Sequence, residues 1–163
     1  MYYFTSITTN YIPKARILCK SLKKKNSKAV FILCLCDKIP DSFNIADEEF
    51  DGILTLDDIK EIKNKDIYRF KHNITELCTA VKPLVAKQIL IDFNTEKVVY
   101  LDPDIVVFSS LDNLEDMLDS YSMVFTPHQT VYETEDSFVR SNEILFLKRG
   151  TMNLGFFFLL NDQ

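Results

Sequence analysis

Apolar residues occur along the chain in two patterns, short continuous blocks and stripes with helical spacing. The block Tyr2 to Ile7 is aromatic and β-branched and stops at a polar turn, which predicts a buried first strand. A helix is predicted next, with Asn10 as its N-cap and Pro13 in its first turn. Its apolar stripe comprises Ile12, Ala15, Leu18, Cys19 and Leu22. Ala29 to Leu35 is a second buried block, and this strand, helix, strand order is typical of a parallel α/β sheet.

The middle of the chain carries a short strand pattern and a clear helix start. Gly52 to Leu56 is predicted as a third strand, followed by a charged helical stretch through Lys65. Asn73 and Glu76 have the spacing of a capping box. Because proline interrupts a helix but is tolerated at its first position, a second helix is predicted from Pro83 to about Ile91.

The last third of the chain alternates apolar blocks with polar connections. Val98 to Leu101 is predicted as a buried strand, which Asp102, Pro103 and Asp104 interrupt before it resumes over 105–108. The remaining predictions are a short helix over 111–118, a strand over 121–126, a polar loop over 129–136 and an aromatic strand over 150–160.

Length and composition fit a single folded domain. A chain of 163 residues with 47% hydrophobic residues predicts a substantial core. The formal charge of -5 gives no broad basic field, so nucleic acid is not expected as a partner. No run approaches the roughly 20 apolar residues that cross a bilayer, and no signal peptide pattern opens the chain. We expect a cytoplasmic protein with at most peripheral contact at the inner face of the membrane.

The four cysteines of the chain lie inside apolar segments. They are Cys19, Cys34, Cys36 and Cys78. Their spacing does not match a zinc site, and no redox motif is formed. Reduced cysteines that pack in the core are therefore predicted.

The pair Asp102 and Asp104 is the clearest candidate for chemistry. It follows a buried strand of the predicted parallel sheet, at the edge where ligands bind in open α/β sheets. In an extended chain, carboxylates two residues apart point the same way. Such oxygen ligands suit Mg²⁺ or Mn²⁺, which proteins hold with one or two carboxylates together with substrate phosphates. The tripeptide around Pro103 is also a favourable turn, so a metal and diphosphate site and a structural turn both stay open.

Four segments in order connect this motif to a known family. They are Thr8 to Tyr11, Thr75 to Pro83, Val99 to Asp104 and Asn153 to Phe156. As an ordered set spanning nearly the whole chain, they resemble bacterial glycosyltransferases related to family eight. The resemblance implies a GT-A fold, which is a Rossmann-like, mostly parallel sheet flanked by helices. It also implies a nucleotide-sugar donor, most often a UDP-sugar, and a divalent metal, usually Mn²⁺.

The resemblance assigns the nucleotide to the end of the first strand. Four residues there would contact the uracil and ribose: Thr8, Thr9, Asn10 and Tyr11. The structural alternative for this segment is a helix cap with a packed tyrosine. Lys82 would face the phosphate or the sugar of the donor, and its alternative is a solvated lysine.

The resemblance assigns the metal and the sugar to the later motifs. Asp102 would contact the ribose or the metal, and Asp104 would be the firmer metal ligand. Asn153 and Gly155 would border the sugar pocket, where a glycine lets the backbone approach the substrate closely. The alternative for Gly155 is a kink in a strand. His128 follows a predicted strand and could approach the nucleotide.

The chain departs from the family in its last part. Family-eight enzymes usually complete the metal shell with a histidine far downstream of the aspartates, and no histidine follows His128 here. We therefore expect one nucleotide-sugar-binding domain over 1–163 that is either a C-terminally truncated fragment or a short member of the family, with its acceptor-binding half missing or minimal.

The favoured function is transfer of a sugar from a UDP-sugar to an acceptor hydroxyl, and the resemblance implies retention at the anomeric carbon. The acceptor would be a glycan, a lipid-linked glycan or a protein. One alternative is a haloacid-dehalogenase-like phosphatase, with Asp102 as nucleophile and Asp104 as acid and base. Another is a noncatalytic nucleotide-sugar-binding domain that acts with a partner chain.

Overall fold

Strands and helices alternate along residues 1–161, the part of the chain that the computed structural model describes. The strands are β1 (Tyr2–Ile7), β2 (Val30–Leu35), β3 (Gly52–Thr55), β4 (Lys97–Leu101), β5 (Met123–Pro127) and β6 (Met152–Leu160). The α-helices are α1 (Ile12–Lys25), α2 (Lys65–Lys71), α3 (Ile74–Ala80), α4 (Lys82–Asp92), α5 (Asp112–Glu115) and α6 (Asp136–Arg149). Short 3-10 helices are η1 (Thr9–Tyr11), η2 (Ile45–Asp47), η3 (Leu56–Asp58) and η4 (Asp116–Asp119). In this part of the chain, no helix has the length and apolar character to span a membrane.

The strands form one mixed sheet in the order β3-β2-β1-β4-β6-β5. Parallel pairs join β1 to β2, β1 to β4 and β2 to β3. β6 runs antiparallel between β4 and β5. These directions bring the carboxyl ends of the parallel strands and the first half of β6 to the same edge of the sheet. The predicted α/β class with a mostly parallel sheet is confirmed.

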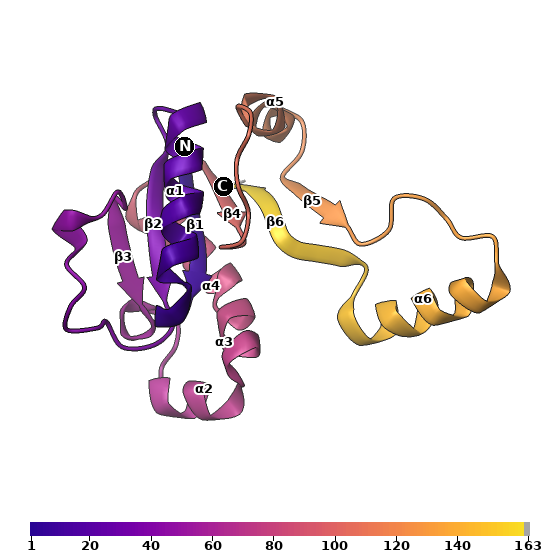
Figure 1. Ribbon diagram of the computed structural model, residues 1–163, viewed down its shortest axis with the longest axis horizontal. Helices are drawn as coiled ribbons and strands as arrows, with labels where there is room; N and C mark the ends of the chain where they lie inside the picture. Colours follow the sequence, from indigo (N-terminus) through magenta and orange to yellow (C-terminus); the bar gives the residue numbers. More distant parts are fainter. Residues whose placement is uncertain (162–163) are drawn as a thin grey trace.

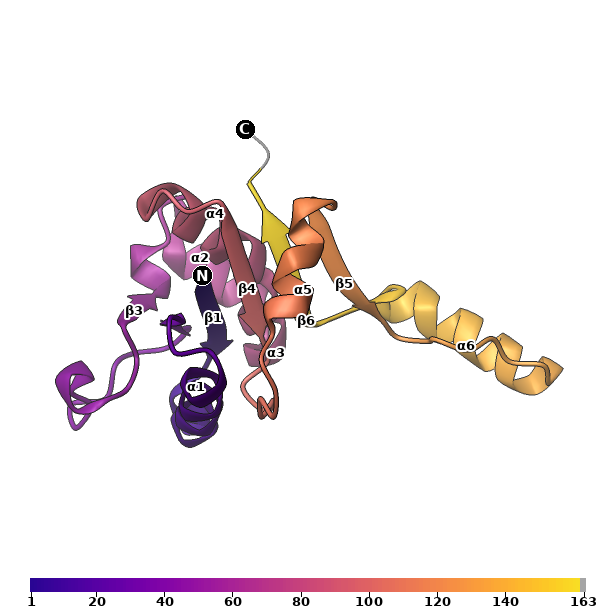
Figure 2. The ribbon, with the colours of Figure 1, turned by 90° about the horizontal axis from the view of Figure 1, so that it is seen from above.

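Helices cover both faces of the sheet, with α1 on one side and α4 on the other (Figure 1, Figure 2). Successive strand residues point to opposite faces, so Tyr3 joins the core cluster under α1 while Phe4 joins the one under α4. The five residues of the predicted α1 stripe are all buried. Burial of these two apolar layers is the main source of stability for the fold.

The start of α1 differs from the prediction. Asn10 lies in the middle of the short helix η1, and Tyr11 is the N-cap of α1. The Asn10 side-chain oxygen accepts a hydrogen bond from Thr8 Oγ1 at 2.6 Å. The side chain therefore pairs with a neighbouring hydroxyl and not with a helix N–H. Pro13 does lie in the first turn of α1, as predicted.

The capping box at α3 is confirmed. The Asn73 side chain accepts a hydrogen bond from the Glu76 N–H at 2.9 Å, and the Glu76 carboxylate accepts one from the Asn73 N–H at 2.9 Å. α3 ends at Ala80, and α4 begins at Lys82 with Pro83 in its first turn. The predicted break therefore lies where Pro83 requires it, and it makes Lys82 the first residue of a helix.

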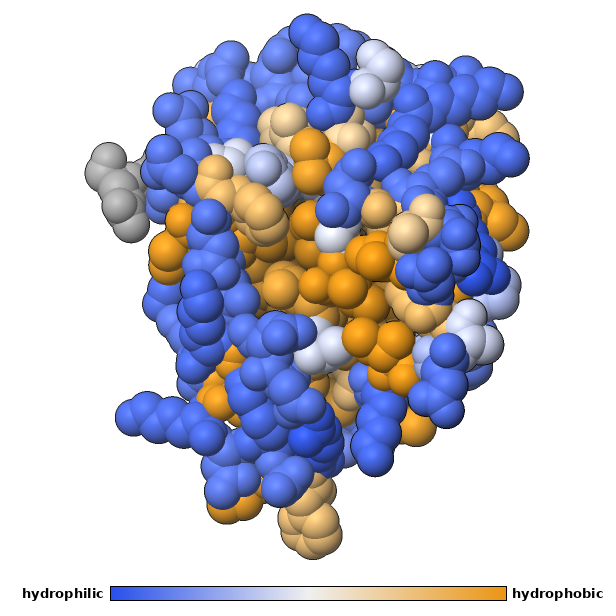
Figure 3. Space-filling model, turned by 90° about the vertical axis from the view of Figure 1, so that its left-hand side faces the viewer, coloured by the Kyte–Doolittle hydropathy of each residue, from blue (hydrophilic) through white to orange (hydrophobic). Residues whose placement is uncertain are grey.

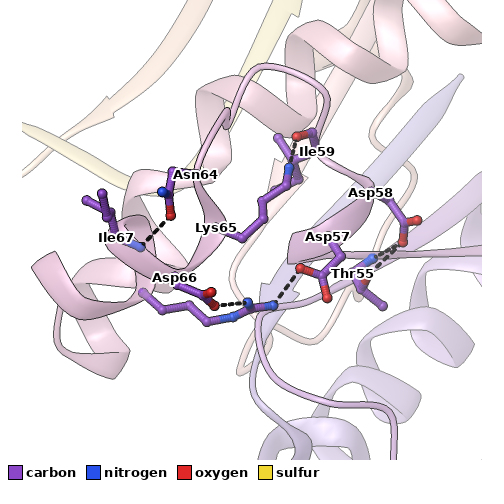
Figure 4. Close-up of polar contacts among 9 residues, drawn as sticks. Thr55, Asp57, Asp58, Ile59, Asn64, Lys65, Asp66 and Ile67 are labelled. Carbon is purple, nitrogen blue, oxygen red and sulfur yellow. Dashed lines mark hydrogen bonds and ion pairs between the residues drawn. The ribbon is translucent and has the colours of Figure 1, made fainter.

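The charged stretch after β3 is not the helix that was predicted. It contains the single turn η3 and an irregular segment, and α2 begins only at Lys65 (Figure 4). The Thr55 N–H donates to Asp58 Oδ2 at 2.7 Å, which closes η3, and Asn64 caps α2 by accepting from the Ile67 N–H at 3.0 Å. The Asp58 and Asn64 side chains, which accept hydrogen bonds from nearby backbone N–H groups, offer the chain an alternative to one continuous helix, and Ile59 and Ile62 between them are buried.

The strand predicted over 105–108 is absent. The Ile105 N–H donates to the Asp102 carbonyl at 3.1 Å, so the chain turns directly after β4. Val107 is buried in the core, whereas Phe108 is 80% exposed. The apolar run over 105–108 has the sequence pattern of a strand, and its side chains alternate between buried and exposed. Within residues 1–161, however, no strand of the sheet pairs with it.

Helix α6 was not predicted, and it extends away from the main body beyond β5 and β6 (Figure 1, Figure 2). None of its residues is buried, and Phe138 and Leu147 are largely exposed. Its apolar residues do not form a single stripe, which is why the sequence pattern did not indicate a helix. At the opposite end of the molecule, Figure 3 looks onto the β3 side and shows apolar residues in a hollow surrounded by hydrophilic ones.

We predict that Asn73→Ala lowers the free energy of unfolding by about 1 kcal/mol, because it removes the acceptor of the α3 cap. Asn73→Asp is the matched control, since it keeps an acceptor at the same place. Chemical denaturation of the three proteins measures the difference. Equal loss in both variants would show that the cap contributes nothing.

Candidate functional site

A cleft of about 310 Å³ lies at the carboxyl edge of β1 and β4. Its walls come from the ends of these strands, from η1, from α3 and from the first turn of α4. The lining residues are Ser6, Ile7, Thr8, Tyr11, Ile74, Thr75, Cys78, Thr79, Lys82, Tyr100, Asp102, Pro103 and Asp104. The cleft is where the strand order places a ligand in an α/β sheet.

Asp102 is held by two donors on one of its carboxylate oxygens. Oδ1 accepts a hydrogen bond from the Tyr100 hydroxyl at 2.6 Å and from the Lys82 ammonium at 3.0 Å. Oδ2 accepts none from residues 1–161. The Asp102 side chain is 37% exposed, so this second oxygen is the part of the carboxylate that remains for a ligand.

Lys82 reaches Asp102 from the first position of α4. Its side chain is only 8% exposed, and its ammonium lies 4.1 Å from the centre of the Tyr100 ring. The same ammonium donates to the Leu154 carbonyl at 2.9 Å. A charge buried this deeply requires partners, and Lys82 has a carboxylate, a carbonyl and an aromatic face.

Tyr100 and Ser6 continue this network into the strands. Ser6 Oγ lies 3.3 Å from the Tyr100 hydroxyl and donates to the Cys78 carbonyl at 2.6 Å. Burial raises the pKa of Tyr100 far above its ordinary value, and the Asp102 carboxylate adds to the shift. The tyrosine therefore stays protonated and serves as a fixed hydrogen-bond donor to Asp102.

Gly155 lies against Asp102. Its carbonyl accepts a hydrogen bond from the Asp102 N–H at 2.7 Å. A Cβ on Gly155 would lie 2.6 Å from Asp102 Oδ2 and 2.9 Å from Asn153 Oδ1. The glycine leaves the space that the aspartate side chain occupies. The assignment of Gly155 to the border of a sugar pocket stays a prediction.

Asp104 lies on the cleft wall two residues further along. It is exposed, and within residues 1–161 it forms neither a hydrogen bond nor an ion pair. The extended geometry expected for Asp102 and Asp104 is wrong, because the chain turns between them. Both residues nevertheless line the same cleft. The turn and the candidate site are therefore the same structure, not alternatives.

The strand-end segment is divided between the cleft and the surface. Thr8 and Tyr11 line the cleft. Thr9 does not, because its N–H donates to the Asp37 carboxylate at 3.0 Å and its hydroxyl donates to the Lys38 carbonyl at 3.3 Å. Asn10 bonds to Thr8 and is not part of the lining.

Two other candidates lie outside the cleft lining. Asn153 is exposed, and its side-chain oxygen accepts a hydrogen bond from the Gly155 N–H at 2.7 Å, so it acts on the backbone next to Asp102. His128 is exposed, and its N–H donates to the Thr151 carbonyl at 3.0 Å. Its Nδ1 lies 3.1 Å from the Gly150 carbonyl. The structure does not bring His128 to the aspartates.

Several cleft residues were assigned no role from the sequence, although Thr75, Cys78, Thr79 and Tyr100 lie in the segments matched to the family. They are Ser6, Ile74, Cys78, Tyr100 and the threonines Thr75 and Thr79. Ser6 and Tyr100 lie in apolar strands, where a polar atom gives no pattern of its own. All four cysteines are free, as predicted. Contact with the Cys36 thiol and burial raise the pKa of Cys78, so its thiol is protonated in the cleft wall.

Two carboxylates of the cleft are candidate ligands for a divalent cation. Within residues 1–161, no group of three or more His, Cys, Asp or Glu side chains could hold a metal. The cleft offers Asp102 Oδ2 and the Asp104 carboxylate, two hard oxygen ligands without other partners. These fit an ion whose remaining positions a diphosphate fills. The donor set suits Mg²⁺ or Mn²⁺ and does not suit a soft metal.

Solved structures similar to the chain share this architecture. A galactosyltransferase, LgtC, solved in complex with donor and acceptor sugar analogs, aligns with a TM-score of 0.57 and 16% identity, over 98% of this chain and 58% of LgtC. GlyE of Streptococcus pneumoniae TIGR4, a glycosyltransferase, aligns with a TM-score of 0.54 and 19% identity, over 98% of this chain and 33% of GlyE. Mouse xyloside xylosyltransferase 1 aligns with a TM-score of 0.53 and 13% identity, over 98% of this chain and 65% of the mouse protein. No curated protein sequence gives a match.

The sheet order and these neighbours define a GT-A fold, the fold class of these glycosyltransferases. The model of glycosyl transferase family 8 matches residues 3–163. The chain belongs to this family, which confirms the resemblance and the fold drawn from the four motifs. It spans about a third to two thirds of the length of the solved structures.

We predict that Gly155→Ala destabilises the protein by about 1–3 kcal/mol, because the new methyl group would overlap the Asp102 carboxylate. Gly52→Ala is the control, since its methyl group would meet the movable end of the Ile32 side chain at 2.9 Å and should cost at most about 1 kcal/mol. Thermal unfolding compares the two variants. A similar loss in both would contradict the special role of Gly155.

Proposed function

We propose that the chain forms the donor-binding part of a glycosyltransferase that transfers a sugar from a UDP-sugar to an acceptor hydroxyl. One observation carries the proposal. Asp102 is held by Lys82 and Tyr100 beside the unpartnered Asp104, in a cleft at the ligand-binding edge of the sheet. Membership of family 8 favours this function over the phosphatase alternative.

The proposed donor site divides into two parts. Thr8 and Tyr11, at the end of β1, are placed to contact the nucleoside, and Tyr11 offers a partly exposed ring for stacking. Asp102 and Asp104 would hold Mn²⁺ or Mg²⁺ together with the diphosphate. When bound, this ion would neutralise charge on the departing diphosphate. Thr9 and Asn10 would act indirectly by shaping the strand end.

The chain's own residues would orient the donor for transfer. The hydrogen bonds to Asp102 Oδ1 hold its carboxylate plane, so Oδ2, which lies against Gly155, has one orientation. Preorganised charge of this kind stabilises a transition state without rearrangement during the reaction. We place the reaction among the retaining transfers, and family membership supports this assignment. Asn153 would contribute by fixing the backbone at Gly155.

The acceptor is proposed in general terms. A glycan, a lipid-linked glycan or a protein hydroxyl would attack the sugar, and LgtC was solved with an acceptor sugar analog. Binding of a donor without transfer is a second candidate function. A cytoplasmic location is part of the proposal.

We predict that UDP with Mn²⁺ stabilises the protein more than either component alone, because the diphosphate completes the metal shell. At about 100 times the dissociation constant, the gain in unfolding free energy is about 2.7 kcal/mol. For a chain of this size the midpoint should rise by roughly 2–4 °C for each kcal/mol. A thermal-shift panel of nucleotides and nucleotide-sugars, with and without Mn²⁺, measures this. No shift with any pair would refute the donor site.

A second prediction concerns Asp104→Asn, which keeps the size and turn-forming ability of the side chain but removes its charge. The stability of the metal-free protein should change little or rise, because two carboxylates in one cleft repel each other. Affinity for UDP in the presence of Mn²⁺ should fall at least about tenfold, equivalent to about 1.4 kcal/mol.

Isothermal titration with UDP, at fixed Mn²⁺ and again with the metal chelated, tests this effect. Asp41→Asn, in an exposed turn outside the cleft lining, is the matched control. Equal affinities of the parent and Asp104→Asn would remove Asp104 from the metal site. Binding of UDP with no sugar transfer to any acceptor would favour the noncatalytic function.

A further inference from the structure

The two aspartates of the cleft differ in their partners. Asp102 has a cation within hydrogen-bonding distance, the Lys82 ammonium at 3.0 Å, whereas Asp104 has none in the described part of the chain. Lys82 is 8% exposed and its ammonium is also bound by the Leu154 carbonyl at 2.9 Å. A lysine that awaits a phosphate would extend into the cleft. Lys82 lines the cleft wall, and its ammonium is already engaged by Asp102, the Leu154 carbonyl and the face of Tyr100.

We propose that Lys82 is a resident counter-ion of Asp102, which holds the first aspartate in the metal-free protein and competes with a divalent cation for it. This inference rests on the proposed metal-dependent donor site and adds that Lys82 competes with the metal for Asp102. Lys82 would then be a positioning residue that sets the charge and orientation of Asp102. It would not need to contact the donor in this role.

Electrostatics supports competition at this position. An ammonium close to a carboxylate reduces the attraction of that carboxylate for a second cation, and the effect is strong where burial lowers the local dielectric. Lys82 and Tyr100 both occupy Oδ1, so a cation finds Oδ2 as the free oxygen of Asp102. The metal-free cleft should therefore bind Mn²⁺ weakly until a diphosphate supplies further ligands.

The same contacts would link metal binding to strand β6. The ammonium joins the start of α4, the end of β4 and the Leu154 carbonyl in β6. Asp102 is also tied to β6 by the hydrogen bond from its N–H to the Gly155 carbonyl. Weakening the Lys82 contact with Asp102 would leave the ammonium with the Leu154 carbonyl and the face of Tyr100, so it would remain at the cleft wall.

The first test measures the pair in the metal-free protein. Thermal unfolding is compared for the parent, Lys82→Met, Asp102→Asn and the double variant, all in chelator. Each single variant leaves one charge without its partner, so the double variant should unfold about 2–4 °C above the additive expectation. Strict additivity would overturn the pairing. Lys82→Met and the double variant both lose the contact with the Leu154 carbonyl. This loss therefore cancels in the comparison and cannot produce the coupling.

The second test titrates Mn²⁺ alone, without nucleotide. Lys82→Met should bind Mn²⁺ about tenfold more tightly than the parent, since the competing charge is gone. Lys87→Met is the matched control. It removes the same charge from the same helix, but Lys87 is exposed and paired with Glu61 outside the cleft lining. If Lys82→Met does not fold, Lys82→Gln replaces it and keeps a donor for the Leu154 carbonyl.

The outcomes separate this inference from the proposed function. Tighter Mn²⁺ binding in Lys82→Met, with Lys87→Met unchanged, supports competition. Unchanged or weaker Mn²⁺ binding in Lys82→Met, while UDP and Mn²⁺ still stabilise the parent, overturns competition and leaves the donor site intact. Absence of Mn²⁺ binding in every variant, with and without UDP, overturns both.

Discussion

The ion pair between Lys82 and Asp102 is the interaction around which the cleft is arranged. A lysine ammonium with 8% exposure requires a counter-charge, and Asp102 supplies it at 3.0 Å. The pair draws together the first residue of α4, the residue after β4 and a carbonyl of β6. Because one carboxylate oxygen is used in this way, the orientation of the other is set before any ligand arrives.

The topology of the sheet makes this pair possible. β6 enters antiparallel beside β4, so its first half lies next to the carboxyl end of β4 and brings Gly155 against Asp102. Only a residue without a Cβ leaves space for the carboxylate there. If β6 ran parallel to β4, its last residues and not Gly155 would lie beside the carboxyl end of β4. The mixed sheet therefore serves the site as well as the core.

Family membership and fold agree on a glycosyltransferase of family 8, while α6 is less enclosed than the rest of the chain. α6 has no buried residue among those described, in contrast to α1 with its buried stripe. The donor site rests on contacts within a packed sheet, and the acceptor rests on similarity to longer proteins.

The sequence by itself determined the elements whose signals are local. The α1 stripe, the Asn73 capping box and the helix break before Pro83 follow from spacing and backbone chemistry, and all three are present. The ordered motifs also determined the family. Tertiary structure alone decided the partners of Lys82 and the role of Gly155, because these contacts join residues 20, 53 and 72 positions apart. No local pattern encodes which carbonyl or carboxylate a distant strand will bring to a buried ammonium.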